Sequence, residues 1–312
     1  MRIDVHAHYY PDEFTKAYGR ETTISRNART APGGRVTIDE RVDMLKEAGI
    51  DLQVLCVGGQ QPAFEKAEEA ASVASYLNDM YAETCKGYGG RFAAFGATPL
   101  PHVDQAIKEA GRALDSLGML GINVGTSIAG RPPDDAAFEP FFAELDRRGA
   151  VLFLHPVGVG GPNMDAYGLD FMMGACFEVT VASIRLVMSG LSSKYPNIKI
   201  IVPHLGGTLP FLFQRIDNAI ERQKLAGVNP PVDKLSDAVR GFYWDTVNNY
   251  PGALRLACEA LGADHIMLGT DFPFILFKPC VEYVQKSGLP PEQIDQILER
   301  TAAKLLGVAR GI

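Results

Sequence analysis

Eight short apolar segments recur along this 312-residue chain, and a longer segment with helical character separates most of them. They read RIDVHAHYY, DLQVLCVGG, FAAFGATPL, LGINVGTS, VLFLHPVG, IKIIVPHLGG, FYWDTVN and HIMLGTDFPF. Several are continuously apolar rather than alternating, as is typical of parallel strands covered by helices on their outer side. A strand and a helix repeated eight times is the pattern of a (β/α)8 barrel, the α/β fold that we predict.

The segments between the strands carry ordinary helix signals. Thr37 and Glu40 fit a capping box at the start of TIDERVDMLKEAG, and Val42, Leu45 and Ala48 form its apolar stripe. The segments HVDQAIKEAGRALDSLG, DDAAFEPFFAELDRRG, PGALRLACEALG and PPEQIDQILERTAAKLLG have the same character. A doubly wound open sheet is the main structural alternative, but no GxGxxG or GxxxxGK[ST] turn follows any of the strands.

No linker-like stretch divides the chain, so we predict a single domain over residues 1–312. Two connections are too long to be simple turns, residues 10–36 and residues 157–177. Each follows a strand that carries histidine, and long loops in a compact domain are more often functional than idle. We expect both to act as lids over a site.

Charge and composition exclude several classes of partner. The formal charge of −7 and the isoelectric point near 5.4 argue against nucleic-acid binding, which needs a basic face. We find no signal-like leader and no run of about 18 apolar residues, so we expect no membrane partner and a cytoplasmic location. The five cysteines form no CxxC pair, so neither a disulfide framework nor a thiolate zinc site is indicated.

Chemistry-bearing side chains occur where the predicted strands end, which is where barrel enzymes place their active sites. The first strand ends with His6 and His8, the fifth with His155, the sixth with His204 and the eighth with Asp271. His6 and His8 are two residues apart, so strand alternation places them on one face, with Asp4 below them.

A metal site explains this convergence best. Three imidazoles and one carboxylate around an open position suit one divalent ion, with zinc preferred and manganese, iron or cobalt as alternatives. Water at the open position ionises near neutral pH and supplies a nucleophile or a proton donor. The other two histidines are given no role: His102 stands where a helix begins, and His265 lies at the opposite end of its strand.

Several of these motifs together resemble the amidohydrolase superfamily, and more narrowly its metal-dependent decarboxylase branch. They are HAH on the first strand, HP on the fifth, PHLGGTLPFLFQRID on the sixth and GTDFPF on the eighth. The likeness runs nearly from end to end and includes YWDT and AAKLLG. It implies that His6, His8, His155 and Asp271 hold a single metal, without a carbamylated lysine, and that His204 acts as the general acid/base.

The resemblance implies non-oxidative decarboxylation of a small unsaturated or aromatic carboxylic acid by a homodimer. Hydroxybenzoate decarboxylases of the branch tend to carry an acidic residue where His6 stands, so HAH favours the muconate-semialdehyde type, although hydrolases share it. Phe171 in LDFMMGA stands where that type has a tryptophan in the floor of its pocket. Arg29 is our first choice, among four arginines of the first lid, for binding the substrate carboxylate. Arg215 is a second candidate, reaching a site in its own or a neighbouring subunit.

Two other functions stay open at this point. A metal hydrolase acting on a lactone, an amide or a carbon–carbon bond would use the same site. A non-catalytic metal-binding protein is disfavoured, because His204 would be surplus to a closed structural site with four protein ligands.

Overall fold

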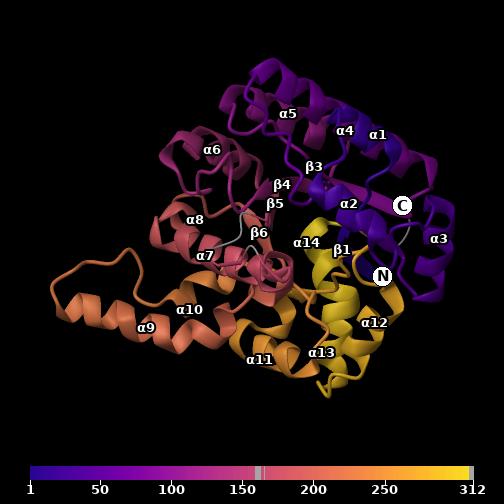
Figure 1. The fold of residues 1–312 in the computed structure, drawn as a ribbon. Helices are drawn as coiled ribbons and strands as arrows, with labels where there is room; N and C mark the ends of the chain where they lie inside the picture. Colours follow the sequence, from indigo (N-terminus) through magenta and orange to yellow (C-terminus); the bar gives the residue numbers. More distant parts are fainter. Residues whose placement is uncertain (159–162, 165, 309–312) are drawn as a thin grey trace.

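Eight parallel strands form one sheet whose order follows the sequence from β1 to β8, in a computed structural model that describes residues 1–158, 163–164 and 166–308. The strands are β1 (Ile3–His8), β2 (Leu52–Cys56), β3 (Phe92–Gly96), β4 (Gly121–Gly125), β5 (Val151–His155), β6 (Lys199–Val202), β7 (Tyr243–Asp245) and β8 (Ile266–Met267). All eight lie inside the segments predicted from the sequence. Helices surround the strands (Figure 1), which confirms the (β/α)8 prediction.

The helices occupy the connections between the strands. They are α1 (Asp12–Ala17), α2 (Thr23–Thr30), α3 (Ile38–Glu47), α4 (Ala67–Gly87), α5 (Val103–Asp115), α6 (Glu139–Arg148), α7 (Ala175–Met188), α8 (Leu191–Lys194), α9 (Leu209–Leu225), α10 (Leu235–Ala238), α11 (Pro251–Leu261), α12 (Phe277–Gln285), α13 (Pro291–Asp295) and α14 (Thr301–Leu306). Short 3₁₀ turns η1 (Ala136–Phe138), η3 (His204–Gly206), η4 (Val239–Gly241) and η5 (Ala263–His265) and π turns η2 (Asp170–Gly174) and η6 (Gln296–Arg300) complete the set.

The start of α3 confirms the predicted capping box. The Glu40 amide donates to Thr37 Oγ1 at 3.2 Å, and the Thr37 amide donates to Glu40 Oε2 at 2.8 Å. The buried stripe differs in one residue from the prediction, because Arg41 is 2 % exposed while Val42 is only half-buried. The buried Arg41 side chain reaches the sheet, where its Nε donates to Gln53 Oε1 of β2 at 2.6 Å.

Two apolar layers hold the barrel together. Ile3, Val5, Phe95 and Phe153 belong to the cluster that fills the barrel interior. A larger cluster, to which Ala7 belongs, packs between the outer face of the sheet and the helices. Burying large apolar side chains on both faces of every strand is what stabilises a parallel sheet.

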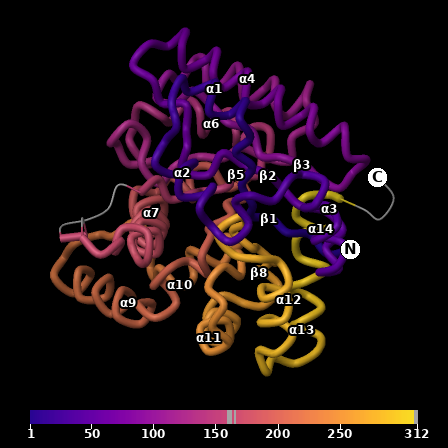
Figure 2. The backbone as a smooth tube through the Cα atoms, turned by 45° about the vertical axis from the view of Figure 1, so that its right-hand side comes forward, coloured from indigo at the N-terminus to yellow at the C-terminus, as the bar shows by residue number. Residues whose placement is uncertain are grey.

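The barrel closes where β8 meets β1, and Figure 2 shows these two strands side by side. Strand pairing at this seam is short: within the described chain, its one bridge joins Ala7 of β1 to Phe272, which lies beyond the end of β8. The Val5 amide donates to the Leu268 carbonyl, and the His8 amide donates to the Phe272 carbonyl at 2.6 Å. The seam lies at the strands that carry three of the predicted metal ligands.

The first long insertion contains structure of its own. Residues 10–36 include α1 and α2, and the Gly33 amide donates to the Pro273 carbonyl at 3.0 Å, beyond β8. A side chain at Gly33 would meet the Phe272 ring at 2.5 Å, so the backbone packs directly on that ring. The insertion therefore rests on the segment that carries Asp271. In the second insertion, 157–177, residues 159–162 and 165 lie outside the described part of the chain.

The helical stretch Asp170–Met188, formed by η2 and α7, is long and apolar enough to cross a membrane by length and composition. It is not an unbroken apolar run, because Asp170, Glu178 and Arg185 lie within it. Its inner residues, including Val179, Ala182 and Leu186, are buried against the barrel, whereas Met172 and Val181 are more than half exposed. The stretch serves as the outer helix that follows β5.

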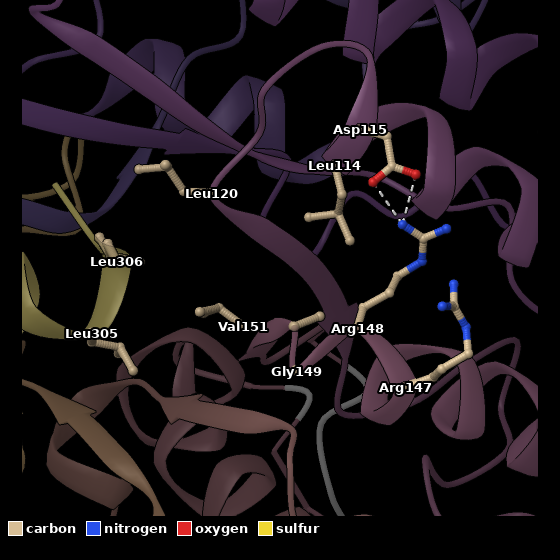
Figure 3. Close-up of a pocket in the computed structure, with 10 residues that line it drawn as sticks. Leu114, Asp115, Leu120, Arg147, Arg148, Gly149, Val151, Leu305 and Leu306 are labelled. Atoms are coloured by element: carbon tan, nitrogen blue, oxygen red, sulfur yellow. Dashed lines mark hydrogen bonds and ion pairs between the residues drawn. The ribbon is translucent and has the colours of Figure 1, made fainter. Parts of the chain in front are cut away.

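A cavity of about 520 Å³ lies at the opposite end of the barrel, near the start of β5 (Figure 3). Arg148 lines it but already pairs with Asp115 at 2.7 Å and with Glu144 at 2.6 Å. In this fold the N-terminal end of the strands serves stability rather than chemistry. This cavity is therefore not the functional site that the sequence predicts.

Candidate metal centre

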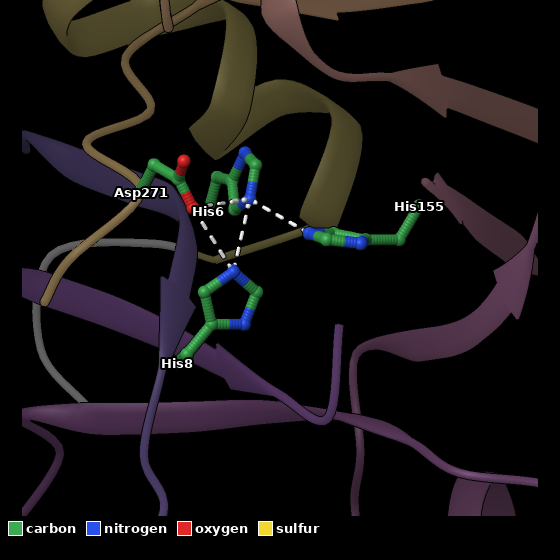
Figure 4. Close-up of side chains that lie close together, drawn as sticks. All are labelled: His6, His8, His155 and Asp271. Carbon is green, nitrogen blue, oxygen red and sulfur yellow. Dashed lines mark hydrogen bonds and ion pairs between the residues drawn. The ribbon is translucent and has the colours of Figure 1, made fainter. Parts of the chain in front are cut away.

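Four side chains, from β1, from β5 and from the segment after β8, converge at the C-terminal end of the barrel (Figure 4). Their ligand atoms all lie within 4.8 Å of one another. His6 Nε2 is 3.3 Å from His8 Nε2 and 3.1 Å from His155 Nε2, and Asp271 Oδ1 is 3.1 Å from His8 Nε2. Metal–ligand distances of about 2.1 Å imply separations of roughly 3.4 Å between tetrahedral ligands. The cluster can therefore hold one divalent metal ion.

The far side of each imidazole is already occupied, which leaves Nε2 free. His6 Nδ1 donates to Asp245 Oδ2 at 2.6 Å, and His155 Nδ1 donates to the Pro156 carbonyl at 2.7 Å. His8 Nδ1 lies 3.3 Å from the Cys56 carbonyl. Such contacts set the tautomer and the orientation of metal-binding histidines. The donor set therefore fits a metal ion better than a chance cluster.

A bulge in β1 aims the two histidines into the barrel. Asp4 pairs with Gln53 of β2 and Ala7 pairs with Leu55, so β1 has one residue more than its partner over this interval. Asp4 and Ala7 consequently face the helices, while His8 faces the interior. The expectation that Asp4 lies below the histidines on the same face is wrong, because strict alternation ignores the bulge.

Asp271 and His204 are held by unusual backbone conformations. Both have a φ of 59°, in the left-handed region that non-glycine residues rarely adopt. Asp271 lies beyond the end of β8 at Met267, and His204 lies in η3 beyond β6, rather than within the strands. The Asp271 amide donates to the His6 carbonyl at 2.8 Å, and the His204 amide donates to Asp245 Oδ1 at 2.8 Å. Strained conformations of this kind cluster at functional sites.

His204 stands beside the cluster without belonging to it. Its ring stacks on the ring of His6 with centroids 5.5 Å apart and planes inclined by 7°. Its Nε2 is buried and has no hydrogen-bond partner in the described structure. A buried polar atom without a partner costs free energy unless a ligand, water or ion satisfies it. This atom is therefore available to a molecule bound next to the metal site.

Charges in the metal-free cluster perturb the pKa values of its members. Burial lowers the pKa of His8 and His204, and burial together with His8 and His6 lowers that of His155. Burial would also lower the pKa of His6, but Asp271 and Asp245 raise it to about 10. Neutral imidazoles are the form that binds metals, so an incoming cation must displace the proton of His6.

Comparison with known proteins agrees with this geometry. The amidohydrolase family model matches residues 3–308. A 2-amino-3-carboxymuconate-6-semialdehyde decarboxylase from Dictyostelium discoideum is 28% identical over 98% of this chain and 89% of its own. A gamma-resorcylate decarboxylase from Rhizobium sp. (strain MTP-10005) is 30% identical over 76% of each. The chain belongs to the amidohydrolase family.

A solved structure extends the likeness to the metal. A dihydroxybenzoic acid decarboxylase from Polaromonas sp. JS666, with bound manganese and the inhibitor 2-nitroresorcinol, aligns with a TM-score of 0.82 at 25% identity, covering 99% of this amidohydrolase and 98% of that chain. The family assignment predicted from the HAH, HP and GTDFPF motifs is confirmed.

The substrate-binding candidates of this amidohydrolase lie in different settings. Phe171 is 57% exposed, and its ring packs on Phe274 at 5.4 Å. Phe274 in turn contacts the His8 ring at 6.0 Å, so Phe171 is connected to the cluster through one aromatic ring. The Arg29 side chain is 63% exposed and pairs with Glu21 at 2.6 Å.

Arg215 is also exposed. It lies on α9, and its side chain makes no hydrogen bond or ion pair with any residue that the structure describes. A surface ion pair of Arg215 with Asp217 or Glu221 does not form among the residues that the structure describes; Asp217 accepts hydrogen bonds from the backbone and side chain of Ser236.

Asp245 is the functional residue that sequence reasoning missed. It is fully buried, and its two oxygens bind His6 Nδ1 and the amides of His204 and Val247. A single carboxylate thus orients both an imidazole of the candidate metal site and the backbone of His204. A signal existed: Asp245 follows two aromatic residues at the C-terminal end of β7, and the C-terminal ends of the strands are where polar site residues were sought.

Proposed function

We propose that this amidohydrolase is a metal-dependent, non-oxidative decarboxylase of a small aromatic or unsaturated carboxylic acid. The observation that carries the proposal is the unpartnered Nε2 of His204 beside a four-ligand cluster. A closed structural metal site has no use for such a group, whereas decarboxylation needs a proton donor next to the substrate. The names of the relatives support this reaction class.

His6, His8, His155 and Asp271 would hold the metal. We propose one ion per chain and zinc as its identity, with manganese as the alternative because the Polaromonas relative binds it. When bound, the cation supplies positive charge that anchors an anionic substrate and stabilises charge developing on it.

His204 would move the proton. Burial lowers its pKa, which makes the protonated imidazole a stronger acid. It would deliver a proton to the carbon that bears the carboxylate. The bond between that carbon and the carboxylate then breaks, carbon dioxide leaves, and the electron pair of the broken bond returns to the conjugated system of the substrate. Solvent protonates His204 again for the next turnover. Asp245 holds the His204 backbone during this exchange.

The substrate ring would lie against Phe171 and Phe274, which extend an aromatic wall from His8 toward solvent. We propose Arg29 as the carboxylate-binding residue of the first lid. To do so it must leave Glu21, an exposed pairing of the kind that contributes little stability. Residues 10–36 and 157–177 would act as the lids of one domain spanning residues 1–312.

We further propose a homodimer in the cytoplasm. Exposed apolar side chains gather along η2 and α7, including Met172, Phe177 and Val181. Association would remove them from water, and Arg215 on α9 would then be placed to reach a neighbouring subunit's site. Light scattering after gel filtration measures the oligomeric state, and Val181→Asp tests this face.

The decisive experiment measures carbon dioxide. The metal-loaded protein is incubated with a panel of hydroxybenzoates and muconate-type acids, with His204→Asn as the control. Release of carbon dioxide by the natural chain alone supports the proposal. Turnover of lactones, amides or esters without carbon dioxide release would identify a hydrolase instead.

A further inference from the structure

A fully buried polar relay lies behind the metal cluster, on the outer face of the bulge in β1. It consists of Asp4 on β1, Gln53 on β2 and Arg41 on α3, none of which reaches the cluster itself. All three are at most 2 % exposed. Burying an opposite charge pair is costly unless every group is well hydrogen-bonded, so its presence in a barrel wall calls for an explanation.

Asp4 joins the two strands that meet at the seam. Its Oδ1 accepts from the amides of His6 at 3.2 Å and Thr270 at 3.0 Å. Its Oδ2 accepts from Gln53 Nε2 at 2.6 Å and from Thr270 Oγ1 at 2.7 Å. One carboxylate therefore binds the backbone of a ligand on β1 and the residue directly before Asp271.

Arg41 joins the same two strands from the helix layer. Its Nε donates to Gln53 Oε1 at 2.6 Å, and its Nη1 donates to the carbonyl of His8 at 2.8 Å. The guanidinium lies over the Phe272 ring, 4.3 Å from its centroid. Arg41 thus contacts a second ligand on β1 and the residue directly after Asp271.

The relay therefore contacts the residues directly before and after Asp271. It also hydrogen-bonds the backbone of both histidines of β1. Backbone pairing at the seam is short in the described chain: it has one bridge and a few hydrogen bonds, among them those from the Asp271 and His8 amides to the His6 and Phe272 carbonyls. The relay adds side-chain hydrogen bonds to this short pairing. Hydrogen bonds to charged groups are stronger and more directional than neutral ones. The hydrogen bonds of Asp4 and Arg41 can therefore fix the position of the His8 backbone relative to the Asp271 segment, and with it the 3.1 Å distance between His8 Nε2 and Asp271 Oδ1.

We propose that Asp4, Gln53 and Arg41 are positioning residues that set the geometry of the metal site by locking β1 to the Asp271 segment across the barrel seam. The inference rests on the proposed metal-dependent function, but it concerns the affinity and geometry of the ion rather than the reaction. Outer contacts of this type typically change metal affinity about 10- to 100-fold.

The test titrates metal into the metal-free variants Asp4→Asn and Thr270→Val in competition with a chromophoric chelator. Thr270→Val removes one donor to Asp4 at nearly constant volume, so it also serves if Asp4→Asn does not fold. The control is Glu109→Gln, a buried carboxylate that binds Asn78 and Arg112 between α4 and α5, away from the seam. Thermal unfolding of the metal-free proteins is measured in parallel.

We expect Asp4→Asn to weaken zinc and manganese binding about 10- to 100-fold, Thr270→Val to weaken it several-fold, and Glu109→Gln to leave it unchanged. Cobalt-substituted Asp4→Asn should show a shifted visible spectrum, which reports altered ligand geometry. Wild-type metal affinity and cobalt spectrum in both seam variants would refute the proposed positioning role. An equal loss of metal affinity in Glu109→Gln would refute it as well. Failure of the natural chain to bind metal would instead refute the proposed function.

Discussion

Gly58 offers the sharpest test of the metal site, because a methyl group there would collide with a ligand. It follows β2 with a φ of +57°. A Cβ at this position would lie 2.5 Å from His8 Cε1 and 2.8 Å from His8 Nδ1. Carbon atoms pack no closer than about 3.5 Å, so Gly58→Ala must push the His8 ring by about 1 Å.

A displacement of this size is incompatible with coordination. Metal–ligand distances tolerate deviations of about 0.2 Å, roughly a fifth of the shift required. We therefore expect Gly58→Ala to lose metal affinity by about 100-fold, at the upper end of the range for changes around a ligand. The left-handed backbone adds a cost of about 1–2 kcal/mol to folding, which must be separated from the clash.

Gly89→Ala separates the two effects. Gly89 has a φ of +54°, and a Cβ there would meet nothing within 4 Å. Both variants carry the backbone strain, but only Gly58→Ala carries the clash. Affinity is measured by competition with a chromophoric chelator and stability by thermal unfolding without metal. Wild-type metal affinity in Gly58→Ala, or an equal loss in Gly89→Ala, would refute the reasoning.

Four further predictions concern the site. The natural chain should bind one divalent ion and His155→Ala should bind none, as elemental analysis of the purified proteins will show; two ions bridged by a modified lysine would contradict the mononuclear site. His204→Asn should keep the metal but lose about 10²- to 10⁴-fold in kcat together with one limb of its pH profile, whereas a metal-free variant would make His204 a ligand. Arg29→Ala should raise KM or lower kcat at normal metal content, and unchanged kinetics would assign the carboxylate to another residue. Metal affinity should rise with pH from 6 to 9, because neighbouring carboxylates raise the pKa of His6 to about 10 and binding must release that proton; calorimetry in two buffers of different ionisation enthalpy counts it, and a pH-independent affinity would exclude it.

The local sequence was sufficient for the eight strands and for the members of the four-residue cluster, although not for α1 and α2 within the first insertion. The capping box at Thr37 and the apolar strands depend on residues close together in the chain, so they are readable without a partner. The convergence of His6, His8, His155 and Asp271 follows from one topological rule, since parallel barrel strands present their C-terminal ends on the same face. The family motifs pointed the same way.

Only the tertiary structure decided how those residues are held. The bulge that turns Asp4 outward depends on the register between β1 and β2, and a one-residue change of register reverses every side chain. The roles of Asp245 and Arg41 arise from contacts across 239 and 33 residues of chain, which no local pattern encodes. The exposed Arg29 side chain likewise pairs with Glu21 on the surface of the first insertion, which only the structure shows. Short sequence segments identify the candidate ligands, but packing between strands that are distant in the sequence sets the angles and distances that a metal site needs.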